Sequence, residues 1–128
     1  MRTVLITDDS KTTQMLVQTT LQRLRDVQFR TAENGREALT VLAREPIDLL
    51  VTDINMPEMD GIALVRAVRK DQPPERLPIL IITAKGEEEA RGEGMKLGAN
   101  AYILKPISGR ELLATADRLL GGTGLATG

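Results

Sequence analysis

Four runs of apolar residues in this sequence each end in side chains that could carry out chemistry. The four ends carry Asp8-Asp9, Asp53 with Asn55 two residues later, Thr83-Ala84 and Lys105-Pro106. Carboxylates that come close together repel one another unless a cation joins them. Mg²⁺ is the natural cation, because it prefers oxygen ligands and commonly shares one or two carboxylates with a phosphate oxygen. The residue types therefore indicate a site for Mg²⁺ and a phosphoryl group.

The same set of residues fits a phosphoryl acceptor. A carboxylate nucleophile forms an acyl phosphate, and the group being transferred carries negative charge on its equatorial oxygens. Mg²⁺ and the ammonium of Lys105 could neutralise that charge. Thr83 could donate a hydroxyl hydrogen bond to a phosphoryl oxygen once one is present. Acceptor, metal ligands and neutralising groups are thus all available.

Each residue taken singly also has an ordinary structural interpretation. Asp8-Asp9-Ser10 could be a turn and a helix cap, and Asp53 could be an acid in a loop rich in Pro, Asp and Gly. Thr83 could be a cap, and Lys105 could be a solvated surface cation. If the strands are parallel, however, all of these residues meet at one edge of the sheet, where functional groups of open α/β sheets gather. Their coincidence favours the functional interpretation.

Composition excludes several other kinds of protein. Seventeen basic and eighteen acidic residues leave a formal charge of −1, so no positive field favours nucleic acid or an anionic membrane. The chain has neither cysteine nor histidine, which excludes disulfides, thiol catalysis and the common zinc sites, and leaves only oxygen ligands for a metal. No apolar run approaches the roughly 20 residues that span a bilayer, and no signal peptide is evident, so we expect a cytoplasmic protein without membrane insertion.

The hydrophobic pattern predicts the elements that must position these residues. Short apolar runs typical of strands buried on both faces cover residues 4–7, 49–52, 79–82 and 102–104, and the alternating run 27–31 is typical of a strand at an edge. Helix-period stretches separate the strands. Alternating strands and helices predict an α/β fold, a doubly wound parallel sheet of five strands with five helices.

Three further features follow from the helical stretches and the end of the chain. Ser108 and Glu111 have the spacing of a capping box, which predicts the start of the last helix. The stretch 87–97 is the weakest helix and is expected to be mobile, because Gly92 and Gly94 each cost about 1 kcal/mol relative to alanine. We expect one domain over residues 1–120 and a flexible tail over 121–128.

With these residues in place, the sequence resembles the receiver domain of bacterial two-component response regulators, in particular members that consist of a receiver alone. The resemblance spans about residues 2–120. It is carried by four motifs: Ile6-Thr7-Asp8-Asp9-Ser10, Asp53-Ile54-Asn55-Met56-Pro57 with Met59-Asp60-Gly61, Ile82-Thr83-Ala84, and Tyr102-Ile103-Leu104-Lys105-Pro106. The resemblance implies the flavodoxin-like strand order 2-1-3-4-5.

The resemblance also implies roles for individual residues. It implies Asp53 as phosphoacceptor, Asp9 and Asp53 as direct Mg²⁺ ligands, Asp8 as a ligand through water, the carbonyl of Asn55 as a further ligand, and Thr83 and Lys105 as binders of the phosphoryl group. Asn55, Ala84 and Lys85 are expected to tune the lifetime of the acyl phosphate. The bond between Lys105 and Pro106 is expected to be cis.

Partners and a switch follow from the same resemblance. A sensor histidine kinase or a phosphotransfer protein would donate the phosphoryl group from a phosphohistidine, which a chain without histidine cannot supply. The chain would not be an enzyme beyond catalysing its own phosphotransfer and dephosphorylation. Thr83 would move toward the phosphoryl group and Tyr102 would turn inward, remodelling a docking face for a downstream protein on the fourth helix, fifth strand and fifth helix. Tyr102 could instead simply pack as a half-buried strand residue.

Three alternative functions remain at this stage. The chain could be a phosphorylation-independent interaction module of the same fold, although a clustered charge without a ligand is costly. A metal-dependent phosphatase with an aspartyl nucleophile would need a second acid or base and a substrate cap, whereas Asn55 occupies the nearby position. A flavin carrier would need phosphate donors after the first strand, where Asp8 and Asp9 would repel a phosphate.

Overall fold

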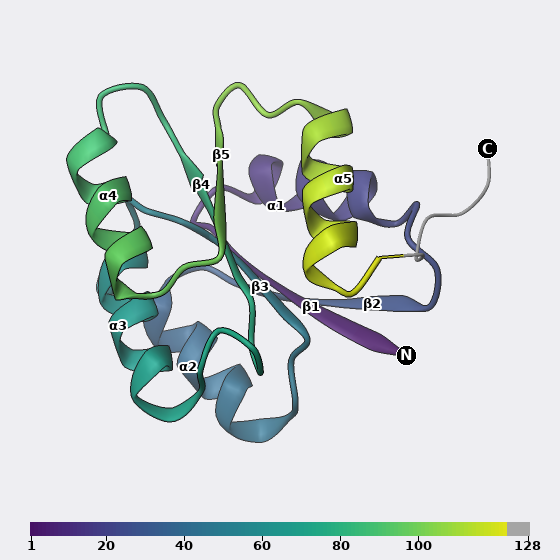
Figure 1. Ribbon diagram of the computed structural model, residues 1–128, viewed down its shortest axis with the longest axis horizontal. Helices are drawn as coiled ribbons and strands as arrows, with labels where there is room; N and C mark the ends of the chain where they lie inside the picture. Colours follow the sequence, from purple (N-terminus) through teal and green to yellow (C-terminus); the bar gives the residue numbers. More distant parts are fainter. Residues whose placement is uncertain (123–128) are drawn as a thin grey trace.

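Five strands and five helices alternate along the chain in the computed structural model, which describes residues 1–122 (Figure 1). The strands are β1 (Arg2–Thr7), β2 (Val27–Ala32), β3 (Leu49–Asp53), β4 (Ile79–Thr83) and β5 (Ala101–Leu104). The helices are α1 (Lys11–Leu21), α2 (Gly35–Arg44), α3 (Gly61–Asp71), α4 (Glu88–Leu97) and α5 (Gly109–Leu119). All five predicted strands and the predicted number of helices are confirmed. Residues 123–128 of the predicted tail lie outside the described residues.

The strands form one sheet in the order β2-β1-β3-β4-β5, and every neighbouring pair is parallel. This is the doubly wound order that the resemblance implied. Because the strands are parallel, their carboxyl ends meet at one edge of the sheet. The register pairs Thr7 with Thr52, Asp53 with Ile82, and Thr83 with Leu104, so the strands end almost level. The fold therefore brings the predicted site residues together.

Helices cover both faces of the sheet (Figure 1). On one face α1 and α5 pack side by side, and on the other face α2, α3 and α4 form a layer. The alternation of side chains along a strand divides the core accordingly: Leu5 contacts the layer of α2, α3 and α4, while Val4 and Ile6 contact that of α1 and α5. The residues of the central strands β1, β3 and β4 are almost all buried, because helices cover both faces.

The burial of one edge strand was predicted correctly from the sequence, and that of the other was not. The alternating run 27–31 is the edge strand β2, as predicted, and most of its residues are only partly buried. The expectation that residues 102–104 are buried on both faces is wrong. β5 is the other edge, and Tyr102 and Leu104 keep 43% and 46% of their surface exposed. Only Ile103 of this strand is deeply buried, because its side chain points to the α1 and α5 side.

Side-chain caps begin four of the five described helices. Ser10, Asn34, Asp60 and Ser108 each accept a hydrogen bond from the backbone N–H three residues later. The bond from the Glu111 N–H to Ser108 is one half of the predicted capping box. α4 forms as predicted despite its glycines. Among the described residues, no helix has the length and apolar character needed to cross a bilayer.

Candidate phosphorylation site

The ends of four strands supply the predicted site residues. Asp8 and Asp9 follow β1, Asp53 is the last residue of β3, Thr83 is the last of β4, and Lys105 follows β5. Since β1 and β4 are the two neighbours of β3, Asp53 lies between the carboxylates on one side and the phosphoryl-binding candidates on the other. Sheet order alone thus explains why residues nearly a hundred positions apart can act together.

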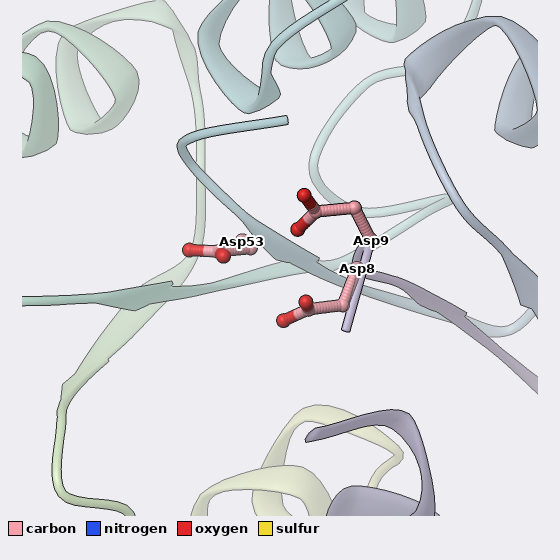
Figure 2. Close-up of side chains that lie close together, drawn as sticks. All are labelled: Asp8, Asp9 and Asp53. Carbon is pink, nitrogen blue, oxygen red and sulfur yellow. The ribbon is translucent and has the colours of Figure 1, made fainter. Parts of the chain in front are cut away.

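Three carboxylates form a cluster at this edge (Figure 2). One oxygen from each of Asp8, Asp9 and Asp53 lies within 4.8 Å of the others. Asp8 and Asp53 are only 3% and 6% exposed, whereas Asp9 is exposed. Backbone donors orient the two buried carboxylates, because the Ser10 N–H donates to Asp8 at 2.8 Å and the Ile54 N–H donates to Asp53 at 2.8 Å.

Burial makes both inner carboxylates costly to ionise. Desolvation raises the pKa of Asp8 to about 6, a hydrogen bond from the Ser10 N–H opposes this, and the nearby charge of Asp53 adds to it. Desolvation also raises the pKa of Asp53, while the Ile54 N–H and the charge of Lys105 lower it. The cluster therefore resists full ionisation unless a cation is bound.

The donor set fits Mg²⁺. Three carboxylate oxygens this close can share one ion, and hard oxygen donors are what Mg²⁺ selects. A divalent ion would offset the desolvation that raises the pKa of Asp8. The partly exposed setting also leaves room for the several waters that Mg²⁺ usually keeps.

Lys105 is the cation nearest to the candidate acceptor. Its Nζ lies 3.3 Å from Asp53 Oδ2. Its backbone N–H donates to the Thr83 carbonyl at 2.7 Å, which ties the end of β5 to the end of β4. The bond between Lys105 and Pro106 is cis, as the resemblance implied. The ammonium is thus held where negative charge on Asp53, or on a group attached to it, would be neutralised.

Thr83 is fully buried, and its hydroxyl donates to a carboxylate that the sequence interpretation did not identify. The acceptor is Glu87, whose Oε1 lies 3.2 Å from Thr83 Oγ1 and 2.5 Å from the backbone nitrogen of Ala84. The side-chain amide of Asn55 donates to the other oxygen of Glu87. Glu87 is the first of three consecutive glutamates, and the other two are the first residues of α4. Such a run is an ordinary helix-start composition, so the sequence carried no signal that one of them turns back toward the site.

Gln14 is a second residue that the sequence interpretation missed. Its side chain is 6% exposed, and its Nε2 donates to the backbone carbonyls of Asp8 at 2.6 Å and Ala32 at 3.2 Å. These bonds tie the loop that carries Asp8 to the end of β2. A polar residue among the apolar positions of a helix was the available signal. Lys85, a predicted rate-tuning residue, is exposed at the start of the same loop as Glu87.

Tyr102 faces outward in this structure. The residue is 43% exposed, and the guanidinium carbon of Arg91, in α4, lies 4.6 Å from the ring centre. This is the geometry of a cation–π contact. The outward ring is the orientation from which the predicted inward turn would start.

Comparison with known proteins agrees with this geometry. Residues 4–117 match the family described as response regulator receiver domain. A chemotaxis protein CheY homolog of Campylobacter jejuni is 37% identical over 119 residues, which cover 92% of each chain. The phosphate regulon transcriptional regulatory protein PhoB of Pseudomonas aeruginosa is 35% identical over 123 residues, which cover 96% of this chain and 53% of that protein.

Solved structures give the same result. The chemotaxis response regulator CheY4 of Vibrio cholerae superposes with a TM-score of 0.81 at 36% identity, over 93% of this chain and 98% of that one. These matches do not favour the interaction module that works without phosphorylation. A stand-alone relative covering nine-tenths of this chain and a family match across all five strands lead to one conclusion. The chain belongs to the response regulator receiver domain family, whose members serve signal transduction as non-enzymatic acceptors of a phosphoryl group.

Proposed function

We propose that Asp53 accepts a phosphoryl group from a phosphohistidine on a sensor histidine kinase or phosphotransfer protein, in a Mg²⁺-dependent reaction. An Asp53 oxygen attacks the phosphorus, the bond between phosphorus and the donor's histidine nitrogen breaks, and the nitrogen leaves with the electron pair. The observation that carries the proposal is the position of Asp53, between a cluster of carboxylates and the ammonium of Lys105 at 3.3 Å.

The surrounding residues have complementary tasks in this proposal. Asp8, Asp9, Asp53 and the Asn55 carbonyl would hold Mg²⁺, which when bound supplies positive charge against the phosphoryl oxygens. Lys105 neutralises a further oxygen, and the Thr83 hydroxyl donates to another. Asn55, Ala84 and Lys85 lie within two residues of Asp53 or Thr83 in the sequence, and in this proposal they tune self-catalysed dephosphorylation.

The output in this proposal is a change of the face formed by α4, β5 and α5, where a downstream protein docks. Thr83 moves toward the phosphoryl group and Tyr102 turns inward. The exposed side chains of Tyr102 and Leu104 on β5 support this choice of face, because exposed large apolar residues side by side favour protein contacts.

The test is to incubate the purified chain with acetyl phosphate, with Mg²⁺ or with a chelator, and to follow intact mass. We expect a gain of one phosphoryl group with Mg²⁺ only, and none in Asp53→Asn, which should keep its circular dichroism spectrum. Asp60→Asn is a matched control, because Asp60 is a nearby acid whose capping role asparagine can fill. Modification of a folded Asp53→Asn at the normal rate would rule out Asp53 as acceptor.

A further inference from the structure

The carboxylate of Glu87 occupies hydrogen-bond donors beside Asp53. It accepts from the Thr83 hydroxyl at 3.2 Å, from the Ala84 N–H at 2.5 Å, and from the side-chain amide of Asn55. Glu87 is also close enough to Asp53 for its negative charge to raise the pKa of that residue. A glutamate from the start of α4 therefore lies in the phosphorylation site itself.

These donors are suited to an anionic oxygen, and a phosphoryl group presents the same kind of acceptor as a carboxylate. Thr83 has one O–H and Ala84 has one N–H, so neither can serve both acceptors fully at once. We propose that Glu87 is an internal competitor, which holds the phosphoryl-binding donors in the unmodified chain and must leave them when Asp53 is phosphorylated. This inference rests on the proposed function of Asp53.

Negative charge in the site determines that phosphorylation displaces Glu87. The site already holds the carboxylates of Asp8, Asp9 and Asp53 near the ammonium of Lys105. A phosphoryl group on Asp53 adds negative charge next to Glu87, and like charges this close repel. The added group also offers three oxygens to Thr83 and Ala84 in place of one carboxylate. Phosphorylation therefore both displaces Glu87 and replaces its hydrogen bonds.

At the start of α4, the side chain of Glu87 forms hydrogen bonds with the site and does not cap its own helix. Among the described helices, α4 alone begins without a backbone N–H that donates to a capping side chain, although Glu87 stands in the cap position. Its bonds to Thr83, Ala84 and Asn55 anchor the first turn instead. When Glu87 leaves, the start of α4 loses that anchor.

α4 also links the site to the surface. Arg91 lies one turn after Glu87, and its backbone N–H donates to the Glu87 carbonyl at 2.9 Å. The Arg91 guanidinium covers the outward ring of Tyr102 at 4.6 Å. A shift of the first turn of α4 would therefore disturb the contact that holds Tyr102 outward. Through Glu87, one helix connects occupancy of the phosphoryl site to the orientation of Tyr102.

Glu87→Gln tests the competition, because glutamine keeps the shape of the side chain but removes the charge that strengthens these hydrogen bonds. Glu89→Gln is the matched control, since Glu89 is exposed in the first turn of α4 and carries the same charge. With acetyl phosphate and Mg²⁺, we expect Glu87→Gln to be modified about tenfold faster than the unaltered chain, and Glu89→Gln to stay within about twofold.

A second measurement uses the Glu87 variants before they are modified, with the phosphorylated chain as the reference. We expect Glu87→Gln and Glu87→Ala, before modification, to shift the amide resonance of Ala84 and to move the fluorescence of Tyr102 toward its value in the phosphorylated chain. Tyr102 reports cleanly because the chain has one tyrosine and no tryptophan. The proposal that Glu87 competes with the phosphoryl group would be overturned if the unaltered chain, Glu87→Gln and Glu89→Gln were modified at equal rates and the Ala84 resonance did not move. Asp53 would still be the acceptor in that case. An unaltered chain that is never modified would instead overturn the proposed function.

Discussion

At the scale of the residue, Lys105 is the group on which transfer and response would both depend in the proposed function. Its Nζ is 3.3 Å from Asp53 Oδ2, and its backbone N–H is bonded to the carbonyl of Thr83. A charge that forms on the phosphoryl oxygens is neutralised best by a cation that is already in place, because no reorganisation is then needed. The same cation would draw the phosphoryl group toward the ends of β4 and β5 after transfer.

Replacing Lys105 with alanine should therefore affect both steps. We expect Lys105→Ala to be modified roughly a hundredfold more slowly, in line with the removal of one donor that stabilises developing charge. For each phosphoryl group that is incorporated, the change in Tyr102 fluorescence should also be smaller. Intact mass and fluorescence on the same samples give both quantities.

Lys85→Ala is the comparison for this variant, because Lys85 is an exposed cation in the loop after β4. It should preserve the fluorescence change for each phosphoryl group incorporated, even if the lifetime of the acyl phosphate is altered. If Lys105→Ala instead showed the normal rate and the full fluorescence change, Lys105 would have no part in the switch.

At the scale of the element, α4 contains two glycines, Gly92 and Gly94. From the sequence, both are predicted to have the same cost to helix stability, but their surroundings in the structure differ. A methyl group added at Gly92 would meet no atom within 4 Å. One added at Gly94 would lie 2.6 Å from Ile81 Cδ1 and 3.1 Å from Ile62 Cδ1. Gly94 is buried and lets α4 approach the sheet, whereas Gly92 only weakens the helix.

The two glycines form a matched pair for mutagenesis. Gly92→Ala should raise the free energy of unfolding by about 1 kcal/mol, the difference in helix propensity between the two residues. Gly94→Ala should lower it by about 1 to 3 kcal/mol, because the added methyl group overpacks the core. Urea denaturation measures both changes. Hydrogen exchange should show slower opening of α4 in Gly92→Ala, and equal effects of the two substitutions would contradict this assignment.

The elements were predictable because their signals are local. Strands with continuous apolar runs, such as residues 79–82, and helices with marked starts, such as that at Ser108, were placed within a few residues. The exposure of β5 was not predictable, since a short apolar run looks the same in a central strand and at an edge. The positions of Asp8, Asp53 and Lys105 were predictable, because each lies at or just after the end of a predicted strand. The position of Glu87 in the site was not predictable, because it depends on how the first turn of α4 packs against the end of β4.

At the scale of the whole molecule, the charges nearly cancel but are unevenly placed. The formal charge is −1, yet three carboxylates meet at one end of the sheet, two of them buried. Such a concentration costs stability in the absence of a cation, so ligand binding and folding must be linked. In the proposed function this cost has a reason, because the same carboxylates would bind the metal and accept the phosphoryl group.

The linkage has a definite sign for Asp8. Its pKa is about 6 in the folded chain against 3.8 for the ordinary side chain, so the folded state holds the proton more tightly. Without metal, its contribution to stability is fully present below pH 3.8 and is lost as pH rises through about 6. The loss is at most about 3 kcal/mol for a shift of this size. Above that pH, Mg²⁺ should restore stability by binding the ionised cluster.

Asp8→Asn should consequently be more stable than the unaltered chain at pH 7 in the presence of a chelator, and should lose much of the stabilisation by Mg²⁺. The comparison is urea denaturation at pH values from 4 to 8, with and without Mg²⁺, and with Asp26→Asn as the control at an exposed aspartate. Asparagine tolerates the positive φ of 52° at position 26.

In metal-free protein, the difference in free energy of unfolding between Asp8→Asn and the unaltered chain should grow between pH 4 and 6 and then stay constant. A difference that does not change with pH would mean that Asp8 is not the buried acid whose ionisation opposes folding, and a full Mg²⁺ response in Asp8→Asn would remove it from the metal site.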